Sequence, residues 1–91
     1  MRPKIRRCLR FKPSVRYFKP QGIPLRHLEE VVLLPDELEV LKLYEVDGLD
    51  QKQAALKMKI SQPTFARILD SAIKKVVLAI IKGKAIKIEE K

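Results

Sequence analysis

Side chains that can recognise nucleic-acid bases and phosphates gather in the segment SQPTFAR. Gln62 can form two hydrogen bonds with adenine, and Arg67 can do the same with guanine. Ser61 and Thr64 carry hydroxyl groups suited to phosphate, and Pro63 offers an apolar surface to a thymine methyl group. The segment therefore has the composition of a base-contacting helix start, provided that the fold presents it to solvent.

The same segment also has an ordinary structural explanation. Ser61 is a favoured helix cap and Pro63 fits a first turn, after which apolar residues recur at helical spacing. A helix is expected over residues 62–82, and Gly83 can end it in a left-handed cap. An αα-hairpin whose exposed residues merely happen to be polar has the same pattern, so the neighbouring elements must decide between the two interpretations.

A shorter helix is expected immediately before this one. Asp50 can cap the segment QKQAALKM, which is expected to be helical to Met58, and the small side chain of Ala55 lets two helices cross closely. A tight turn at residues 59–61 then redirects the chain, and Ile60 plugs it against the core. Such a crossing leaves the first turn of the second helix projecting, as in helix-turn-helix proteins, where that turn enters the major groove.

A lysine stands at the turn position where such proteins usually have glycine. The backbone after Met58 is expected to be left-handed, which costs about 1 kcal/mol for Lys59. A cation at this position can reach a DNA phosphate, so Lys59 joins the candidate contact residues.

Charge is sorted along the chain. The net charge is +9; residues 1–26 contain nine Lys or Arg and no acid, residues 27–50 contain eight acids and Lys42 alone as a base, and residues 51–91 contain ten basic and three acidic residues. Two basic segments that meet in space form a one-sided positive surface, which is typical of nucleic-acid binders. Contacts to phosphates or to the minor groove are expected from the N-terminal residues Arg2, Lys4, Arg6 and Arg7.

The remaining segments predict a mainly α-helical domain of three to four helices. Prolines interrupt residues 1–24, which are expected to form an extended basic arm, and residues 25–91 are expected to form the helix-turn-helix domain. One or two helical turns in PLRHLEE and a break at VVLLP precede a helix expected over residues 35–47. RCLRF near the N-terminus and the alternating residues 84–89 predict a small two-stranded β ribbon formed by the termini.

Composition argues against several other functions. His27 and Cys8 are the only histidine and cysteine, which is too few for a typical metal site. No phosphate-binding loop, nucleophile elbow or His-Asp-Ser set is present, so we expect no enzymatic activity, no catalytic or metal-binding residues and no cofactor. No apolar run approaches the roughly 20 residues needed to span a bilayer. The basic N-terminus lacks the apolar stretch of a secretion signal, and a single cysteine suits a reducing compartment, so a cytoplasmic location is expected.

Several segments together resemble the UPF0251 (DUF134) family of predicted DNA-binding proteins, whose core is similar to region 4 of sigma-70 factors. The matching segments are YFKPQGIPL, LEEVVL, DELEVLKL, GLDQKQAA, SQPTFARIL and GKAIKIE. The resemblance implies a sigma-region-4-like helix-turn-helix and a role related to transcription. Two functions follow from it: sequence-specific binding of double-stranded DNA by a transcriptional regulator, or a protein-interaction module, because region 4 also binds polymerase subunits and activators.

The last helix also raises the question of assembly. Residues 76–81, VVLAII, are apolar in succession, so this part of the helix is apolar on every side. The strands of the termini are expected to cover one side, and a second copy of the chain is expected to cover the rest in a two-fold dimer. The expected partners are thus double-stranded DNA, a second copy and, for the alternative function, RNA polymerase or other transcription proteins; no membrane is expected.

Overall fold

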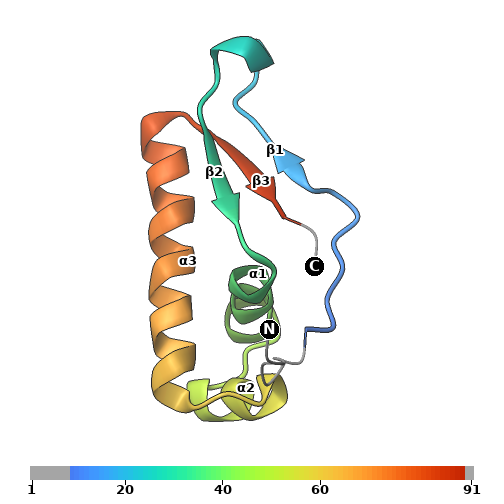
Figure 1. The fold of residues 1–91 in the computed structure, drawn as a ribbon, viewed down its shortest axis with the longest axis vertical. Coiled ribbons are helices and arrows are strands. Elements are labelled where there is room, and N and C mark those ends of the chain that lie inside the picture. The colour runs from blue at the N-terminus through green and yellow to red at the C-terminus, as the bar shows by residue number, and fades with distance from the viewer. Residues whose placement is uncertain (1–8, 90–91) are drawn as a thin grey trace, which may run out of the picture.

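The computed structural model describes residues 9–89. Three helices stand beside a small three-stranded sheet, so the chain is mainly helical, as the sequence predicts (Figure 1). In chain order the elements are β1 (Tyr17–Phe18), the 3-10 turn η1 (Leu25–His27), β2 (Glu30–Leu33), α1 (Pro35–Leu41) with its π-helical continuation η2 (Lys42–Val46), α2 (Gln51–Met58), α3 (Gln62–Lys82) and β3 (Ala85–Ile88).

The two helices α2 and α3 begin at side-chain caps. Asp50 accepts a hydrogen bond from the Gln53 amide at 2.7 Å before α2, and Ser61 Oγ accepts one from the Thr64 amide at 3.2 Å before α3. At its other end α3 stops at Gly83, which has a φ of 68° and is therefore left-handed. Because these signals are local, they set the bounds of both helices at the positions that the sequence predicts.

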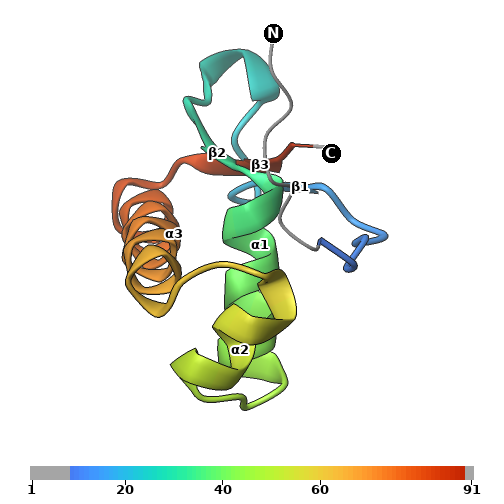
Figure 2. The ribbon, with the colours of Figure 1, turned by 60° about the horizontal axis from the view of Figure 1, so that its bottom comes forward.

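The helices share one apolar core. Figures 1 and 2 show α2 across the N-terminal end of α3, with α1 beside both. Val40 of α1, Met58 of α2 and Phe65 of α3 are fully buried in the cluster where the three helices meet. The rings of Tyr44 and Phe65 add an edge-to-face contact, with their centres 6.4 Å apart. Ala55 is 2% exposed in the same cluster, which confirms the small residue between the crossing helices.

The sheet corrects the expectation of a two-stranded ribbon, because it has a third strand. Its order is β1-β3-β2; β1 pairs antiparallel with β3, and β2 pairs parallel with β3 on the other side, with Val31 opposite Ile86. The segment VVLLP was expected to be a break, but Glu30–Leu33 is the strand β2. Along it burial alternates, with Val31 and Leu33 buried and Glu30 and Val32 exposed, which is the pattern of a half-covered strand.

The N-terminal strand also lies elsewhere than expected. RCLRF at residues 7–11 was expected to be a strand, but residues 9–11 are not in one, while residues 7 and 8 lie outside the described part of the chain. The amides of Arg10 and Phe11 donate to a side chain, Glu39, instead of to a strand, and the strand forms later, at Tyr17–Phe18. PLRHLEE, where one or two helical turns were expected, contains the single 3-10 turn η1.

The sheet packs on α3, as the apolar composition of that helix required. Leu33 of β2 and Ile88 of β3 form a second buried cluster with Ala72 of α3, and Val76 and Ile86 pack against it. This contact covers one side of α3 and fixes the direction in which the helix leaves the sheet.

Candidate nucleic-acid interface

The three-residue turn between α2 and α3 is tightly bonded to the end of α2. Lys59 is left-handed, with a φ of 58°, and is the one non-glycine residue of positive φ among residues 9–89. Its amide donates to the Leu56 carbonyl at 3.1 Å, and the next amide, of Ile60, donates to the Ala55 carbonyl at 3.1 Å. These two bonds form a Schellman motif, in which the residue after the left-handed one packs inward. Ile60 does so, against the main core, and Lys59 stays exposed.

A chain of hydrogen bonds runs along the first turn of α3. Ser61 Oγ donates to Thr64 Oγ1 at 2.9 Å, and Arg67 Nη2 donates to the same Thr64 oxygen at 3.3 Å. One end of the guanidinium is therefore held by Thr64, and the Arg67 side chain is exposed to solvent. Gln62 and Pro63 are exposed on this turn, so the structure brings together the predicted residues 61–67 and Lys59 at one end of the molecule.

The opposite face of the same turn is deeply buried. Phe65 is 0% exposed and Leu69 is 6% exposed, both in the core cluster shared with α1 and α2. Core contacts therefore fix the rotation of α3 about its own axis, so the polar turn faces solvent. A base-contacting helix needs this rigidity, because contact atoms must be positioned within a fraction of an ångström.

An ion pair between buried Glu37 of α1 and partly exposed Lys75 of α3 adds to this rigidity. Glu37, 4% exposed, accepts hydrogen bonds from Ser71 Oγ at 2.6 Å and from Lys75 Nζ at 2.8 Å, and its Oε1 also accepts one from the Leu34 amide at 2.9 Å. Burial by itself raises the pKa of Glu37, but the hydrogen bonds from Leu34, Lys75 and Ser71, with the charge of Lys75, together lower it below the ordinary value. Glu37 is thus an ionised anchor for α3.

A second buried carboxylate holds the basic arm against the helices. Glu39, also 4% exposed, accepts hydrogen bonds from the amides of Arg10 at 3.1 Å and Phe11 at 2.9 Å. Lys42 Nζ lies 5.7 Å from the centre of the Phe11 ring and 2.9 Å from Asp47 Oδ2. The arm therefore enters the described structure at a fixed place beside α1 and η2.

Basic side chains surround this entry point. A hollow of about 220 Å³ has Glu39 and Asp47 among its lining residues, and its basic lining residues are Arg10, Lys12, Lys42 and Lys57. Sequence reasoning missed this group as a set. The acid-free run at the N-terminus contained two members, but only the fold brings them to Lys57 of α2.

The predicted arm residues Arg2, Lys4, Arg6 and Arg7 lie outside residues 9–89, and so does Cys8. His27 is exposed on η1. Between residues 9 and 89 there is no group of three or more His, Cys, Asp or Glu side chains placed to hold a metal ion.

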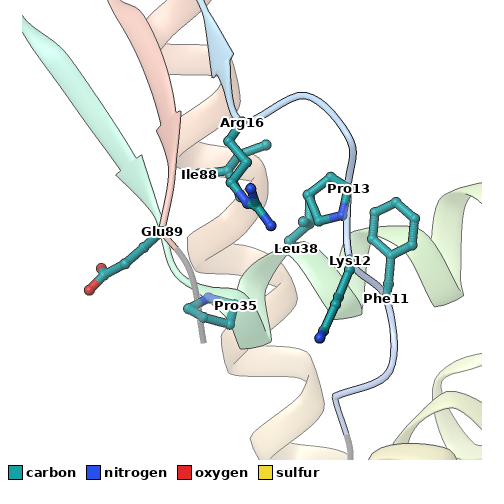
Figure 3. A pocket seen from close by; sticks show the side chains of 8 residues that line it. All are labelled: Phe11, Lys12, Pro13, Arg16, Pro35, Leu38, Ile88 and Glu89. Carbon is teal, nitrogen blue, oxygen red and sulfur yellow. The ribbon is translucent and has the colours of Figure 1, made fainter.

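A separate hollow lies between the arm and the sheet (Figure 3). Its volume is about 180 Å³, less than the roughly 300 Å³ at which small-molecule pockets begin. The guanidinium of Arg16 extends toward Leu38 from the arm, while Glu89 points away from the hollow (Figure 3). The hollow is lined by Phe11, Lys12, Pro13, Arg16, Pro35, Leu38, Ile88 and Glu89. The hollow lies where the arm packs against α1 and β3, and it is too small to enclose a typical organic cofactor.

The match to known proteins covers nearly the whole chain. Residues 1–90 match a family described as a protein of unknown function, DUF134. The chain is 52% identical over 88 residues to a UPF0251 protein of Moorella thermoacetica, a match that covers 97% of this chain and 59% of that protein. It is 50% identical to UPF0251 protein TTE1845 of Caldanaerobacter subterraneus subsp. tengcongensis, with 97% and 75% covered, and 54% identical to a UPF0251 protein of Prosthecochloris aestuarii, with 97% and 57% covered.

The chain therefore belongs to the UPF0251 (DUF134) family. It spans about three fifths of the Moorella relative and three quarters of the Caldanaerobacter one. No solved structure matches the chain. None of the helices in the described part of the chain is long and apolar enough to cross a membrane.

Proposed function

We propose that this chain binds double-stranded DNA in a sequence-specific manner, with α2, the turn and α3 acting as a sigma-region-4-like helix-turn-helix in a transcriptional regulator. One observation carries the proposal: the first two turns of α3 expose Gln62, Pro63 and Arg67, while Phe65 between them is fully buried. A merely capped helix needs Ser61, but it does not need an exposed arginine whose guanidinium is bonded to Thr64. In this proposal the protein is not an enzyme. It acts in the cytoplasm.

Each side chain of the turn has a role in this proposal. Arg67 reads guanine and Gln62 reads adenine in the major groove, while Pro63 contacts a thymine methyl group. Ser61 and Thr64 contact phosphates and orient Arg67. The positive end of the α3 dipole strengthens the phosphate contacts.

Basic residues outside α3 supply affinity that does not depend on sequence. Lys59 contacts a phosphate beside the turn. The arm, anchored by Glu39, carries Arg2, Lys4, Arg6 and Arg7 to phosphates or to the minor groove.

Fluorescence anisotropy with labelled duplex DNA tests the proposal. Random duplexes at about 50 mM salt should bind and should lose affinity steeply toward about 200 mM, because phosphate contacts release counterions. Selection of bound sequences then gives a preferred site. On that site Arg67→Ala should lose about 1–3 kcal/mol of binding free energy and relax specificity, whereas Lys59→Ala should weaken all sequences alike and lower the salt slope by about one.

Matched controls separate these effects from a loss of net charge. Arg26→Ala removes an exposed guanidinium from η1, at the opposite end of the molecule from α2, and should leave affinity nearly unchanged (Figure 1). Lys82→Ala is the matched control for Lys59→Ala: it removes an exposed ammonium group at the other end of α3 and should also leave affinity nearly unchanged. Equal losses in all four variants, or no binding at low salt, would contradict the proposal.

The alternative function is a protein-interaction module of the transcription machinery. Exposed apolar side chains on η2 and α2 favour it: Val46 is 77% exposed and Leu56 is 69% exposed. In that case Val46→Lys and Leu56→Lys should abolish capture of RNA polymerase or another transcription protein, while Arg67→Ala should not. DNA binding that is unaffected by the Val46 and Leu56 variants supports the first function.

A further inference from the structure

An uncovered apolar face remains on the C-terminal half of α3. Ile73 is 39% exposed, Val77 51%, Ile80 69% and Ile81 73%. At 100° per residue these four side chains fall on one face of the helix, centred on Val77. The sheet packs on another side of α3, around Ala72, and leaves this face to solvent. Four branched aliphatic side chains in one exposed patch on a small domain are typical of a binding surface.

Charges at the two ends of this face favour a second copy of the chain as its partner. Asp70 lies on the same face toward the N-terminus, and Lys84 follows the C-terminal end of α3. If two α3 helices pack antiparallel about Val77, Asp70 of each copy faces Lys84 of the other. Ile73 of each then faces Ile81 of the other. A parallel pairing would instead oppose Asp70 to itself and would align the two helix dipoles unfavourably.

The charged groups are accessible for such a contact. Asp70 pairs with Lys74 on its own helix at 3.1 Å, and Lys84 pairs with Glu29 at 3.3 Å. The Asp70 side chain is 66% exposed. The Lys84 side chain is 28% exposed, but its partner Glu29 is 79% exposed, so both in-chain pairs lie at the surface, where a new partner can share or replace them.

An apolar hollow extends the face from α3 onto the sheet. Four side chains on one helix cannot supply the roughly 800 Å² per partner of a standard interface. The hollow beside Ile80 has a volume of about 310 Å³, and Phe18 at its edge is 52% exposed. It is lined by Phe18, Lys19, Pro20, Ala79, Ile80, Gly83, Lys84 and Ile86. A second copy that packs on α3 therefore meets a continuous apolar surface that reaches β1 and β3.

We propose that the chain forms a two-fold dimer in which the C-terminal halves of two α3 helices pack antiparallel about Val77. The inference stands without DNA binding. If the proposed function holds, the dimer also fixes the distance between the two DNA-binding turns. The middle of the segment 62–67 is about 12 residues from Val77, so at 1.5 Å per residue the two recognition turns lie about 35–40 Å apart. That spacing is close to the 34–36 Å between half-sites in successive major grooves.

Sedimentation equilibrium of the full chain tests the dimer. Wild-type protein at tens of micromolar should have about twice the 10.5 kDa mass of one chain. Val77→Lys puts two like charges at the two-fold axis and should give a monomer whose circular dichroism is unchanged. Val46→Lys, which makes the same replacement at a more exposed valine on η2, should remain dimeric. A wild-type mass near that of one chain, or a dimeric Val77→Lys variant, would overturn the proposal.

Thiol crosslinking tests the antiparallel register in a Cys8→Ser background. Val77→Cys should crosslink to itself with a short bifunctional reagent, because Val77 lies on the axis. Ile73→Cys alone should not crosslink, but a mixture of Ile73→Cys and Ile81→Cys chains should. Efficient self-crosslinking of Ile73→Cys would show a parallel pairing and would overturn the antiparallel arrangement.

Discussion

Lys75 Nζ of α3 lies 2.8 Å from Glu37 Oε1 of α1 and also donates to the Val32 carbonyl of β2 at 2.9 Å. One ammonium group thus joins the sheet, the first helix and the candidate recognition helix. Ser71 Oγ completes the shell around the carboxylate at 2.6 Å. Breaking this junction should loosen α3 at its middle, between the turn proposed to read DNA and the apolar face proposed to pair.

The stability of the protein should therefore fall in acid because of Glu37. Its folded-state pKa is lowered from the ordinary value of 4.5, so its stabilising contribution is present above that value and is lost as the pH falls through the folded pKa. At pH 7, Glu37→Gln should lose about 1–3 kcal/mol of unfolding free energy, and below about pH 4.5 its deficit relative to wild type should shrink. Urea titrations between pH 3 and 7 measure both, with exposed Glu45→Gln as the control. A deficit that stays constant with pH would rule out the ionised anchor.

Two substitutions at Lys59 should separate backbone strain from charge. Glycine adopts the left-handed conformation without strain, whereas alanine is strained in it. Lys59→Gly should therefore be about 1 kcal/mol more stable than Lys59→Ala. Both variants remove the same ammonium group, so both should lose DNA affinity to the same extent. Thermal unfolding and anisotropy, run in parallel, give the two quantities. If affinity followed stability instead, the proposed phosphate contact of Lys59 would be wrong.

The sequence predicted well those structural features that depend on residues close to one another along the chain. The bounds of α3 follow from Ser61 and Gly83, each of which acts on a turn that it adjoins. The left-handed turn at Lys59 and the burial of Ala55 follow likewise from short spacing between two helices. The exposed first turn of α3 belongs to this group, and its use in DNA binding remains a prediction.

The features that the sequence did not predict depend on distant partners. β2 exists because β3, more than 50 residues later, offers it a parallel edge, and the proline after VVLL obscured the alternating pattern. Glu37 and Glu39 lie near the start of α1, where the helix dipole by itself favours acidic residues. Their partners, at Lys75 and at the amides of Arg10 and Phe11, lie too far along the chain for any local pattern to indicate.

Enlarging Ala55 should disturb the crossing of α2 and α3. The side chain is 2% exposed, and its carbonyl accepts the amide of Ile60 in the turn. Ala55→Leu should therefore overpack the crossing and lose about 1–3 kcal/mol of unfolding free energy. Lys52→Leu adds a leucine at an exposed position of the same helix and should change stability little. Equal melting temperatures for Ala55→Leu and wild type would mean that the helices do not pack closely there.

The Glu39 carboxylate should control where the basic arm leaves the folded domain. Its Oε1 accepts two backbone amides, so Glu39→Ala leaves the amides of Arg10 and Phe11 without this partner and should lose about 1–3 kcal/mol of stability. Hydrogen exchange followed by NMR should show faster exchange at these two amides, while protection within α3 stays at its wild-type level. Glu45→Ala removes an exposed carboxylate from η2, the continuation of α1; it is the control and should leave both amides protected. Unchanged exchange at Arg10 and Phe11 in Glu39→Ala would mean that other contacts hold the arm. If the amides do open, the arm loses its fixed entry point, and the salt dependence of DNA binding should weaken while the preferred sequence stays the same.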